Sequence, residues 1–351
     1  MTLSSHVPNR AWSSLLAAIF VLLVLQADSF AGAAWRTPSG IPSTEIASRI
    51  NELATKHIGV TTPGAVIVIV KDGGIDFSKG YGYADVENRI EVDPATTVFE
   101  YGSISKLFVY ATFMRLAEVG LLDLNADIRS FLPEGFLKRL RYDAPITFYH
   151  VMDHTAGFED YLFDLVHAFP NKFPSLEQAL LNSQPAQVYR PGTVSAYSNY
   201  AVALAAYIAQ QLIGKEFFAY LRDTIFTPLA MHHTSAHPLL ADHPAMLQQK
   251  AIGYDSRPAM RFKKGFWSHI PLYPAGAVNG TAEDLARFAI ALMPPDGEES
   301  PLFQKRDTLD TMLSRSPVSS ELSGFAHGFI LSKDNRGALG HGGNTAFLHL
   351  S

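Results

Sequence analysis

Early in the chain the apolar positions follow a strand pattern. Residues 64–70 (GAVIVIV) are almost entirely apolar and rich in β-branched side chains, which favours a buried strand. The Lys-Asp-Gly-Gly segment at 71–74 is a turn signal, so residues 75–83 are expected to return as the second strand of a hairpin. Strand-like and loop segments reappear much later, around residues 275–280.

Between these segments the pattern is mostly helical. Ser43 is a good N-cap for the first predicted helix, and Gly120 is a natural C-terminal stop for the second. Helices are expected at residues 44–56, 103–119, about 200–212 and 282–292.

Strands toward both ends of the chain, with helices between them, predict an α+β fold. A sheet lobe is expected from about residues 44–100 and 275–351. A mostly helical lobe, from about residues 103–274, is expected as an insertion between these two parts.

The first residues have the pattern of a secretory signal peptide. His6 and Arg10 precede an unbroken apolar run at 15–25, and Ala31-Gly32-Ala33 matches a small-x-small cleavage site. The run is shorter than the roughly 20 residues that span a bilayer. We therefore predict a signal peptide over residues 1–33, a domain over 34–351 and no membrane span after cleavage. The protein is expected to be periplasmic or secreted, or membrane-anchored if the signal is retained.

Composition excludes several classes of protein. A formal net charge of -5 and the absence of any Lys/Arg run argue against a nucleic-acid partner. The chain has no cysteine, which excludes disulfides, thiolate metal sites and a cysteine nucleophile. His232, His233 and His237 lie in a proline-flanked segment without a nearby carboxylate pair, so no metal site is predicted there. No phosphate-binding Gly-rich loop or Gly-x-Ser-x-Gly motif occurs, and no cofactor is predicted.

The most informative chemistry is Ser103-Ile104-Ser105-Lys106, the one Ser-x-x-Lys in the chain. Residues three apart on a helix share a face, with Cβ atoms roughly 5–6 Å apart, so the Lys106 amine is expected to reach the Ser103 hydroxyl. A desolvated lysine can take the proton of a serine and make it nucleophilic. Taken alone, the two residues are better explained as common surface side chains, and the two further motifs change that balance.

Two further motifs follow in order. Tyr197-Ser198-Asn199 is the one Tyr-x-Asn in the chain; a tyrosine can relay a proton, and an asparagine amide can hold a substrate carbonyl and a lysine. The alternative is a buried aromatic residue followed by a helix N-cap. His341-Gly342-Gly343 predicts an extended segment that a substrate backbone can approach. Its alternative is a glycine turn beside a surface histidine.

With these three motifs the chain resembles the β-lactamase-related serine hydrolases, which include class C β-lactamases, D-alanyl-D-alanine carboxypeptidases and related esterases. The resemblance runs from about Ile46 to the last residue and includes residues 152–158, 189–200 and 228–231. It implies a β-lactamase/transpeptidase-like fold with an active site in the groove between the lobes.

The resemblance also implies roles for individual residues. Ser103 would be the nucleophile, Lys106 its base and Tyr197 a proton relay. The substrate would bind to the remaining residues of the motifs, namely Asn199, His341, Gly342, Gly343 and Asn344. The backbone N–H groups of Ser103 and Asn344 would stabilise the oxyanion. His341 stands where many relatives have lysine, which weakens the case for a dedicated β-lactamase and leaves peptidase or esterase activity open.

In the family, two strands and a helix follow the third motif, whereas this sequence ends at Ser351. The sequence is therefore interpreted as C-terminally truncated, with a sheet that lacks its middle strands. Two functions are open: a serine hydrolase acting on D-alanyl peptides, β-lactams or small esters, or a catalytically silent relative that binds cell-wall peptide or a protein. The pattern does not indicate the substrate among these or an oligomeric state.

Two other segments carry polar groups near the motifs. His154 is interpreted as a structural residue that supports the groove. Glu159 and Asp160 are adjacent acids that do not face each other on a helix, and a solvated face is predicted for them.

Overall fold

The structure is a computed structural model. It describes residues 35–37, 39–160, 166–167, 173–255, 262–316, 324–332 and 337–350. The predicted signal peptide at 1–33 lies outside the described residues, so it stays a prediction. The chain divides into two compact units at the boundary between Lys56 and His57. The described part of the first unit consists mainly of helix α2 (Ser43–His57), as the sequence predicts.

The predicted hairpin is confirmed in the second unit. Strand β1 (Gly64–Lys71) pairs antiparallel with β2 (Gly74–Asp85), and β3 (Ile90–Glu91) extends the sheet. Asp72 and Gly73 both have positive φ, at 49° and 75°, which is the geometry of a two-residue hairpin turn. Among the described residues, no other strand pairs with the second edge of β1.

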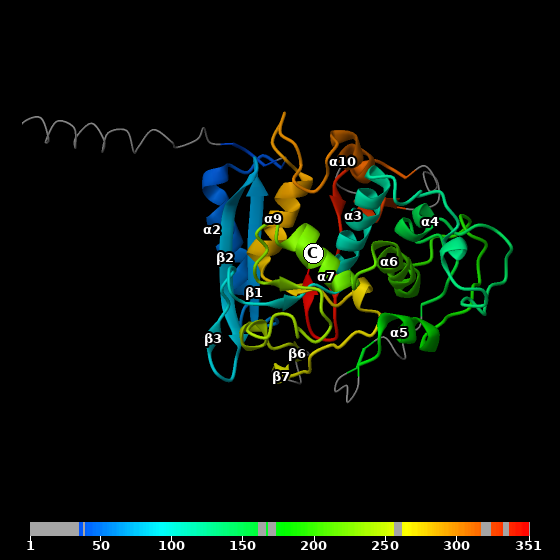
Figure 1. Ribbon diagram of the computed structural model, residues 1–351. Helices are drawn as coiled ribbons and strands as arrows, with labels where there is room; N and C mark the ends of the chain where they lie inside the picture. The colour runs from blue at the N-terminus through cyan, green and yellow to red at the C-terminus, as the bar shows by residue number, and fades with distance from the viewer. Residues whose placement is uncertain are drawn as a thin grey trace, which may run out of the picture. The chain divides into compact units, whose positions relative to one another are not determined.

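Helix α9 (Ala282–Leu292) covers this hairpin and has the predicted bounds. It packs against β1, as Figure 1 shows, and its Glu283 carboxylate accepts a hydrogen bond of 2.8 Å from Ser78 of β2. Its N-cap Thr281 accepts from the Asp284 backbone N–H, which satisfies one of the free donors of the first turn.

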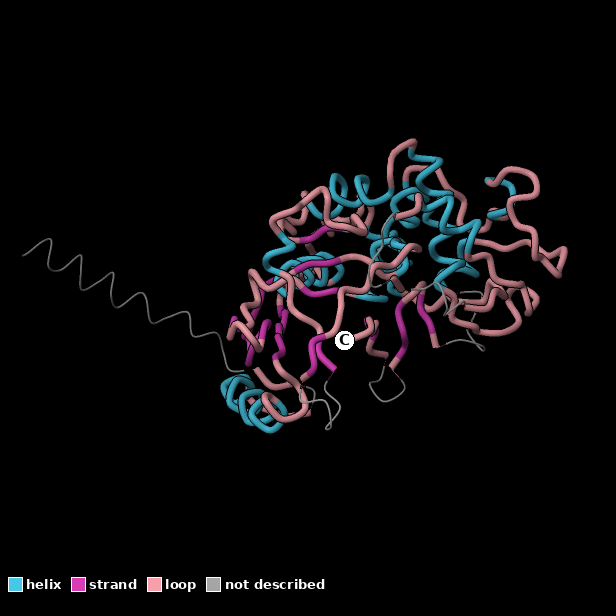
Figure 2. The backbone as a smooth tube through the Cα atoms, turned by 90° about the horizontal axis from the view of Figure 1, so that it is seen from below, coloured by secondary structure: helices cyan, strands magenta, loops and turns pink. Residues whose placement is uncertain are grey.

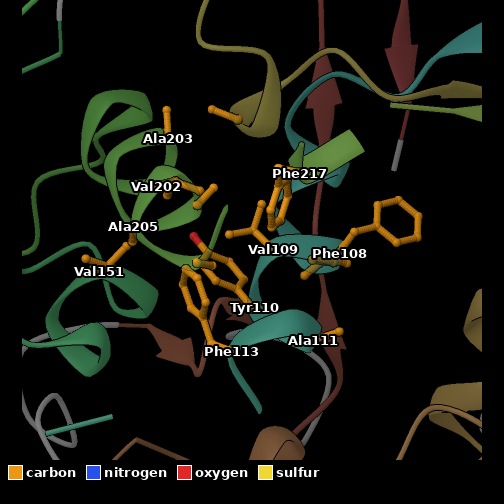
Figure 3. Packing of buried hydrophobic residues seen from close by; sticks show 14 of the residues in the cluster. Phe108, Val109, Tyr110, Ala111, Phe113, Val151, Val202, Ala203, Ala205 and Phe217 are labelled. Atoms are coloured by element: carbon orange, nitrogen blue, oxygen red, sulfur yellow. The ribbon is translucent and has the colours of Figure 1, made fainter. Parts of the chain in front are cut away.

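The helical core is built around α3 (Ser105–Glu118) and α6 (Asn199–Ile213). Figure 3 shows Phe108 and Tyr110 of α3 in the same cluster as Val202 of α6, and all three are fully buried. The other described helices and turns of the second unit are η1 (Gly102–Ile104), η2 (Ile128–Phe131), α4 (Phe148–Met152), α5 (Leu176–Asn182), α7 (Phe217–Leu221), η3 (Arg222–Phe226), α8 (Met246–Gln249), η4 (Tyr273–Ala275) and α10 (Arg306–Leu313).

Short strands complete the second unit. They form the sheet β4-β8-β5, the pair β6-β7, the sheet β11-β10-β9 and the pair β12-β13. In Figure 2 the strands of this unit run along one side and most of its helices lie on the other. The bounds are β4 (Phe99–Glu100), β5 (Thr234–Ser235), β6 (Tyr254–Asp255), β7 (Lys263–Lys264), β8 (Asn279–Gly280), β9 (Phe325–Ala326), β10 (Phe329–Leu331), β11 (Leu339–Gly340), β12 (Gly343–Asn344) and β13 (His349–Leu350).

These elements confirm an α+β architecture. The predicted division into a sheet lobe and a helical lobe stays a prediction, and so does the predicted truncation. In the part of the chain that the structure describes, no helix is both long enough and apolar enough to cross a bilayer.

Candidate active site

Ser103 lies in the turn η1, which leads directly into helix α3. Gly102 precedes it with a φ of +54°, a left-handed conformation that glycine adopts without strain. Ser103 and Lys106 are therefore one helical turn apart, and the Lys106 Nζ lies 3.0 Å from the Ser103 Oγ. Ser103 is half-buried, whereas Lys106 is fully buried.

The Lys106 amine has uncharged hydrogen-bond partners. It donates to the Ser103 hydroxyl, to the Asn199 Oδ1 at 2.7 Å and to the Ala275 carbonyl at 2.5 Å. Burial lowers the pKa of Lys106 to about 7, although the negative charge of Asp160 acts in the opposite direction. A substantial fraction of this lysine is therefore neutral near physiological pH, as a general base must be.

Tyr197 completes the surroundings of the lysine. It precedes α6, whose N-cap Ser198 accepts from the Ala201 N–H, and the Lys106 Nζ lies 4.9 Å from the centre of the Tyr197 ring. Desolvation raises the pKa of Tyr197 to about 12, while the nearby Ser103 side chain opposes the shift. The tyrosine is thus protonated and close enough to Ser103 for the two side chains to interact.

The side-chain amide of Asn199 lies between the Lys106 amine and the Asp160 carboxylate. Its Oδ1 accepts from Lys106, while its Nδ2 donates to the Asp160 Oδ2 at 2.6 Å and its backbone N–H donates to the Asp160 Oδ1 at 3.1 Å. The prediction of a solvated face was therefore wrong for Asp160, because its two oxygens accept hydrogen bonds from the N-terminus of α6. Glu159 is exposed, as predicted.

His154 lies beneath this segment and is fully buried, in agreement with a structural role. Its Nδ1 accepts from the Ser198 backbone N–H at 3.3 Å, and its ring centre is 4.2 Å from that of Tyr197. Burial holds the pKa of His154 well below its usual range, so the ring is neutral. The segment 154–160 thus holds the Tyr-x-Asn motif at both of its ends.

The third motif packs tightly against the turn that carries Ser103. A Cβ added to Gly343 would lie 1.9 Å from the Tyr101 carbonyl oxygen, so only glycine permits this approach. The Thr345 N–H donates to the Leu348 carbonyl, which makes this a hydrogen-bonded pair of the β12-β13 hairpin. Because such pairs alternate, the neighbouring Asn344 N–H points away from β13, on the side where its nitrogen meets Gly102.

His341 lies close enough to Lys106 for a positive charge on the lysine to affect the pKa of the histidine. Its ring shares a hydrogen bond of 2.7 Å with the Gly342 carbonyl, so the Nδ1 must carry the proton there. Burial lowers the pKa of His341 to about 4, and the nearby lysine adds to this effect. The Nε2 of the neutral ring is a buried acceptor without a partner among the described residues.

The structure therefore brings Ser103, Lys106 and Asn199 into one hydrogen-bonded cluster, with the Tyr197 ring and the third motif beside it. Sequence reasoning missed Asp160 and the Ala275 carbonyl. Within the described ranges, no group of three or more His, Cys, Asp or Glu side chains is arranged to hold a metal ion.

Comparison with known proteins gives a single family. A family model described as Beta-lactamase matches residues 51–349. "Protein flp" of Staphylococcus aureus (strain MRSA252) is 27% identical over 282 residues, which are 78% of this chain and 54% of that protein. A D-aminopeptidase of Gluconobacter oxydans is 27% identical over 61% of this chain and 38% of its own length. The chain spans about half the length, or less, of these curated relatives.

Solved structures agree in fold. The octameric penicillin-binding protein homologue from Pyrococcus abyssi superimposes with a TM-score of 0.67 and 23% identity, over 86% of this chain and 68% of its own. A β-lactamase/D-alanine carboxypeptidase from Yersinia pestis gives a TM-score of 0.63 at 20% identity, over 83% of this chain and 82% of its own. The fold is thus β-lactamase/transpeptidase-like.

Proposed function

The chain belongs to the beta-lactamase family, and from that premise we propose that it is a serine hydrolase that forms an acyl-enzyme through Ser103. The observation that carries this proposal is the position of Lys106. Its amine is buried, bonded to uncharged groups and 3.0 Å from the serine hydroxyl. That combination supplies a base which is neutral at a useful pH and in reach of the proton that it must remove.

The proposed reaction has two halves. The Ser103 oxygen bonds to the carbonyl carbon of the substrate while its proton passes to the Lys106 Nζ. That proton then moves through the Tyr197 hydroxyl to the leaving oxygen or nitrogen, which departs as the carbonyl forms again. Water attacks the resulting ester in the second half and frees the acid and the serine.

Two backbone N–H groups would stabilise the negative oxygen between these steps. Ser103 supplies one, and Asn344 supplies the other because its N–H faces away from β13 toward the turn at Gly102. A donor of this kind is typically worth about 3 kcal/mol in the transition state. Gly343 allows the third motif to lie this close to the turn that carries Ser103.

His341 suggests which substrates the site prefers. A neutral imidazole offers no positive charge to a carboxylate. We therefore expect neutral esters or amides to react better than substrates that end in a carboxylate, such as D-alanyl-D-alanine peptides and penicillins. If the predicted signal peptide is cleaved, the reaction takes place in the periplasm or outside the cell, on a small molecule or peptide.

A fluorophosphonate probe tests the proposal without knowledge of the substrate. The folded protein should be labelled, and Ser103→Ala should abolish labelling while its circular dichroism and thermal unfolding stay unchanged. Absence of labelling in well-folded protein would contradict the hydrolase and favour a relative that binds without catalysis.

A substrate panel then tests the preference. Wild-type protein should hydrolyse a neutral nitrophenyl ester with a higher kcat/KM than a D-alanyl-D-alanine peptide or a chromogenic cephalosporin. His341→Lys should change that ratio by about tenfold or more toward the carboxylate-bearing substrates, since a charged donor contributes about 1.5–3 kcal/mol. An unchanged ratio of kcat/KM values would show that His341 does not determine the substrate preference. The proposal of an acyl-enzyme through Ser103 would still stand.

A further inference from the structure

Asp160 contacts two donors of the same residue at the N-terminus of α6. Its Oδ2 accepts from the Asn199 Nδ2 at 2.6 Å, and its Oδ1 accepts from the Asn199 backbone N–H at 3.1 Å. We infer that Asp160 is a positioning residue which holds the Asn199 amide with its oxygen toward Lys106. This inference rests on the proposed function of the cluster and extends it to a residue outside the three motifs.

The orientation follows from donor and acceptor chemistry. An ionised carboxylate can only accept hydrogen bonds, so the amide must present its amino group to Asp160. The amide carbonyl then faces the opposite way, where it accepts from the Lys106 Nζ at 2.7 Å. Without the carboxylate, only the Lys106 donor would favour this orientation, and a neutral amine, which can also accept, would resist a half-turn of the amide less than the two groups do together.

The contact also places a negative charge near the lysine without a direct ion pair. Asp160 raises the pKa of Lys106, whereas burial acts more strongly in the opposite direction. The other titratable groups with which Lys106 interacts are Tyr197, which is protonated, and His154 and His341, which are neutral. Asp160 is therefore the one anion among these neighbours.

Two substitutions separate orientation from simple packing. Asp160→Ala removes both acceptors and the charge. Asp160→Asn keeps the size of the side chain but offers an amino group of its own, so Asn199 is expected to turn its oxygen toward residue 160 and its amino group toward Lys106. Glu159→Gln is the matched control, because it removes an adjacent negative charge from an exposed side chain.

The experiment measures the second-order rate of Ser103 labelling by the fluorophosphonate probe from pH 5 to pH 10. Both Asp160 variants should label about tenfold or more slowly on the high-pH plateau, because a hydrogen bond that orients the lysine is lost. Their half-maximal rate should also move to lower pH, since the anion that favours protonated Lys106 is gone. Glu159→Gln should match the wild type in both respects.

Neutron crystal structures of the wild type and of Asp160→Asn, which distinguish an amide oxygen from an amino group, give a second readout that does not need activity. The proposal requires that the Asn199 Oδ1 leaves the Lys106 Nζ in the variant. It is overturned if the amide keeps its orientation, or if both variants label with the rate and the pH midpoint of Glu159→Gln. If the wild type is not labelled at all, the hydrolase proposal fails, and the crystallographic comparison still decides the role of Asp160.

Discussion

The side chains of Lys106 and Lys250 both extend into the protein interior, but their amines contact different partners there. Lys250 donates to the Glu100 carboxylate at 2.8 Å and lies 4.8 Å from the centre of the Trp267 ring, with only 9% of its side chain exposed. Lys106 is fully buried and donates to a hydroxyl, an amide oxygen and a backbone carbonyl. The two regions therefore differ in charge compensation rather than in burial.

The difference explains how one lysine can be a base and the other a structural cation. Burial lowers the pKa of both, but at Lys250 the charge and the hydrogen bond of Glu100 oppose the shift directly. At Lys106 the opposing anion, Asp160, acts through the Asn199 amide, and the pKa falls to about 7. Uncharged acceptors thus hold the amine in place without forcing it to keep its proton.

The largest effect that this comparison predicts is on chemistry. Lys106→Met should lower the rate of Ser103 labelling by about 10²–10⁴-fold, the range typical of a lost general base. The folded state should survive, because the substitution replaces a poorly compensated buried amine by an apolar side chain of similar length. A variant that labels at the wild-type rate would show that another group takes the serine proton.

Lys250→Met should have the opposite profile. It leaves the Glu100 carboxylate buried without its cation, which is expected to cost about 3–5 kcal/mol of unfolding free energy. The labelling rate per folded molecule should change little. Urea unfolding measures the first quantity, and the double variant Lys250→Met/Glu100→Leu should recover much of the loss. Unchanged stability in the single variant would mean that the ion pair is not compensating a buried charge.

A third effect, of similar size, concerns the dependence of stability on pH. The pKa of Lys106 is about 7 in the folded state and near 10.5 in the unfolded chain, so between these values the unfolded state binds more protons. The wild type should therefore gain stability relative to Lys106→Met as the pH rises from 7 to 10, with a slope of about 1.4 kcal/mol per pH unit. Below pH 7 the difference should be flat. A stability difference between the two proteins that stays constant from pH 7 to pH 10 would contradict the lowered pKa of Lys106.

Local features of the sequence predict the elements well. The β-branched run and the Asp72-Gly73 turn correctly predict the β1-β2 hairpin, and α9 begins at Ala282, the predicted residue. Ser103 and Lys106 are also predictable as neighbours, because helix geometry alone decides which side chains lie one turn apart.

Contacts between distant segments could not be predicted in the same way. Asp160 is 39 positions from Asn199, and the carbonyl of Ala275 is 169 positions from Lys106. A carboxylate in a loop has the same local pattern whether it meets water or an amide, and a backbone carbonyl has no side-chain signature at all. The lysine pKa depends on these contacts and on the packing of α3 against α6, so it follows from the fold and not from the motif.

The pH dependence of Ser103 labelling in the wild-type protein tests the central claim most directly. If neutral Lys106 is the base, the labelling rate should rise with pH and reach half of its plateau near pH 7, the pKa to which burial lowers this lysine. A midpoint above about pH 9, close to the ordinary pKa of a lysine, would contradict the account. A rate independent of pH would contradict it as well.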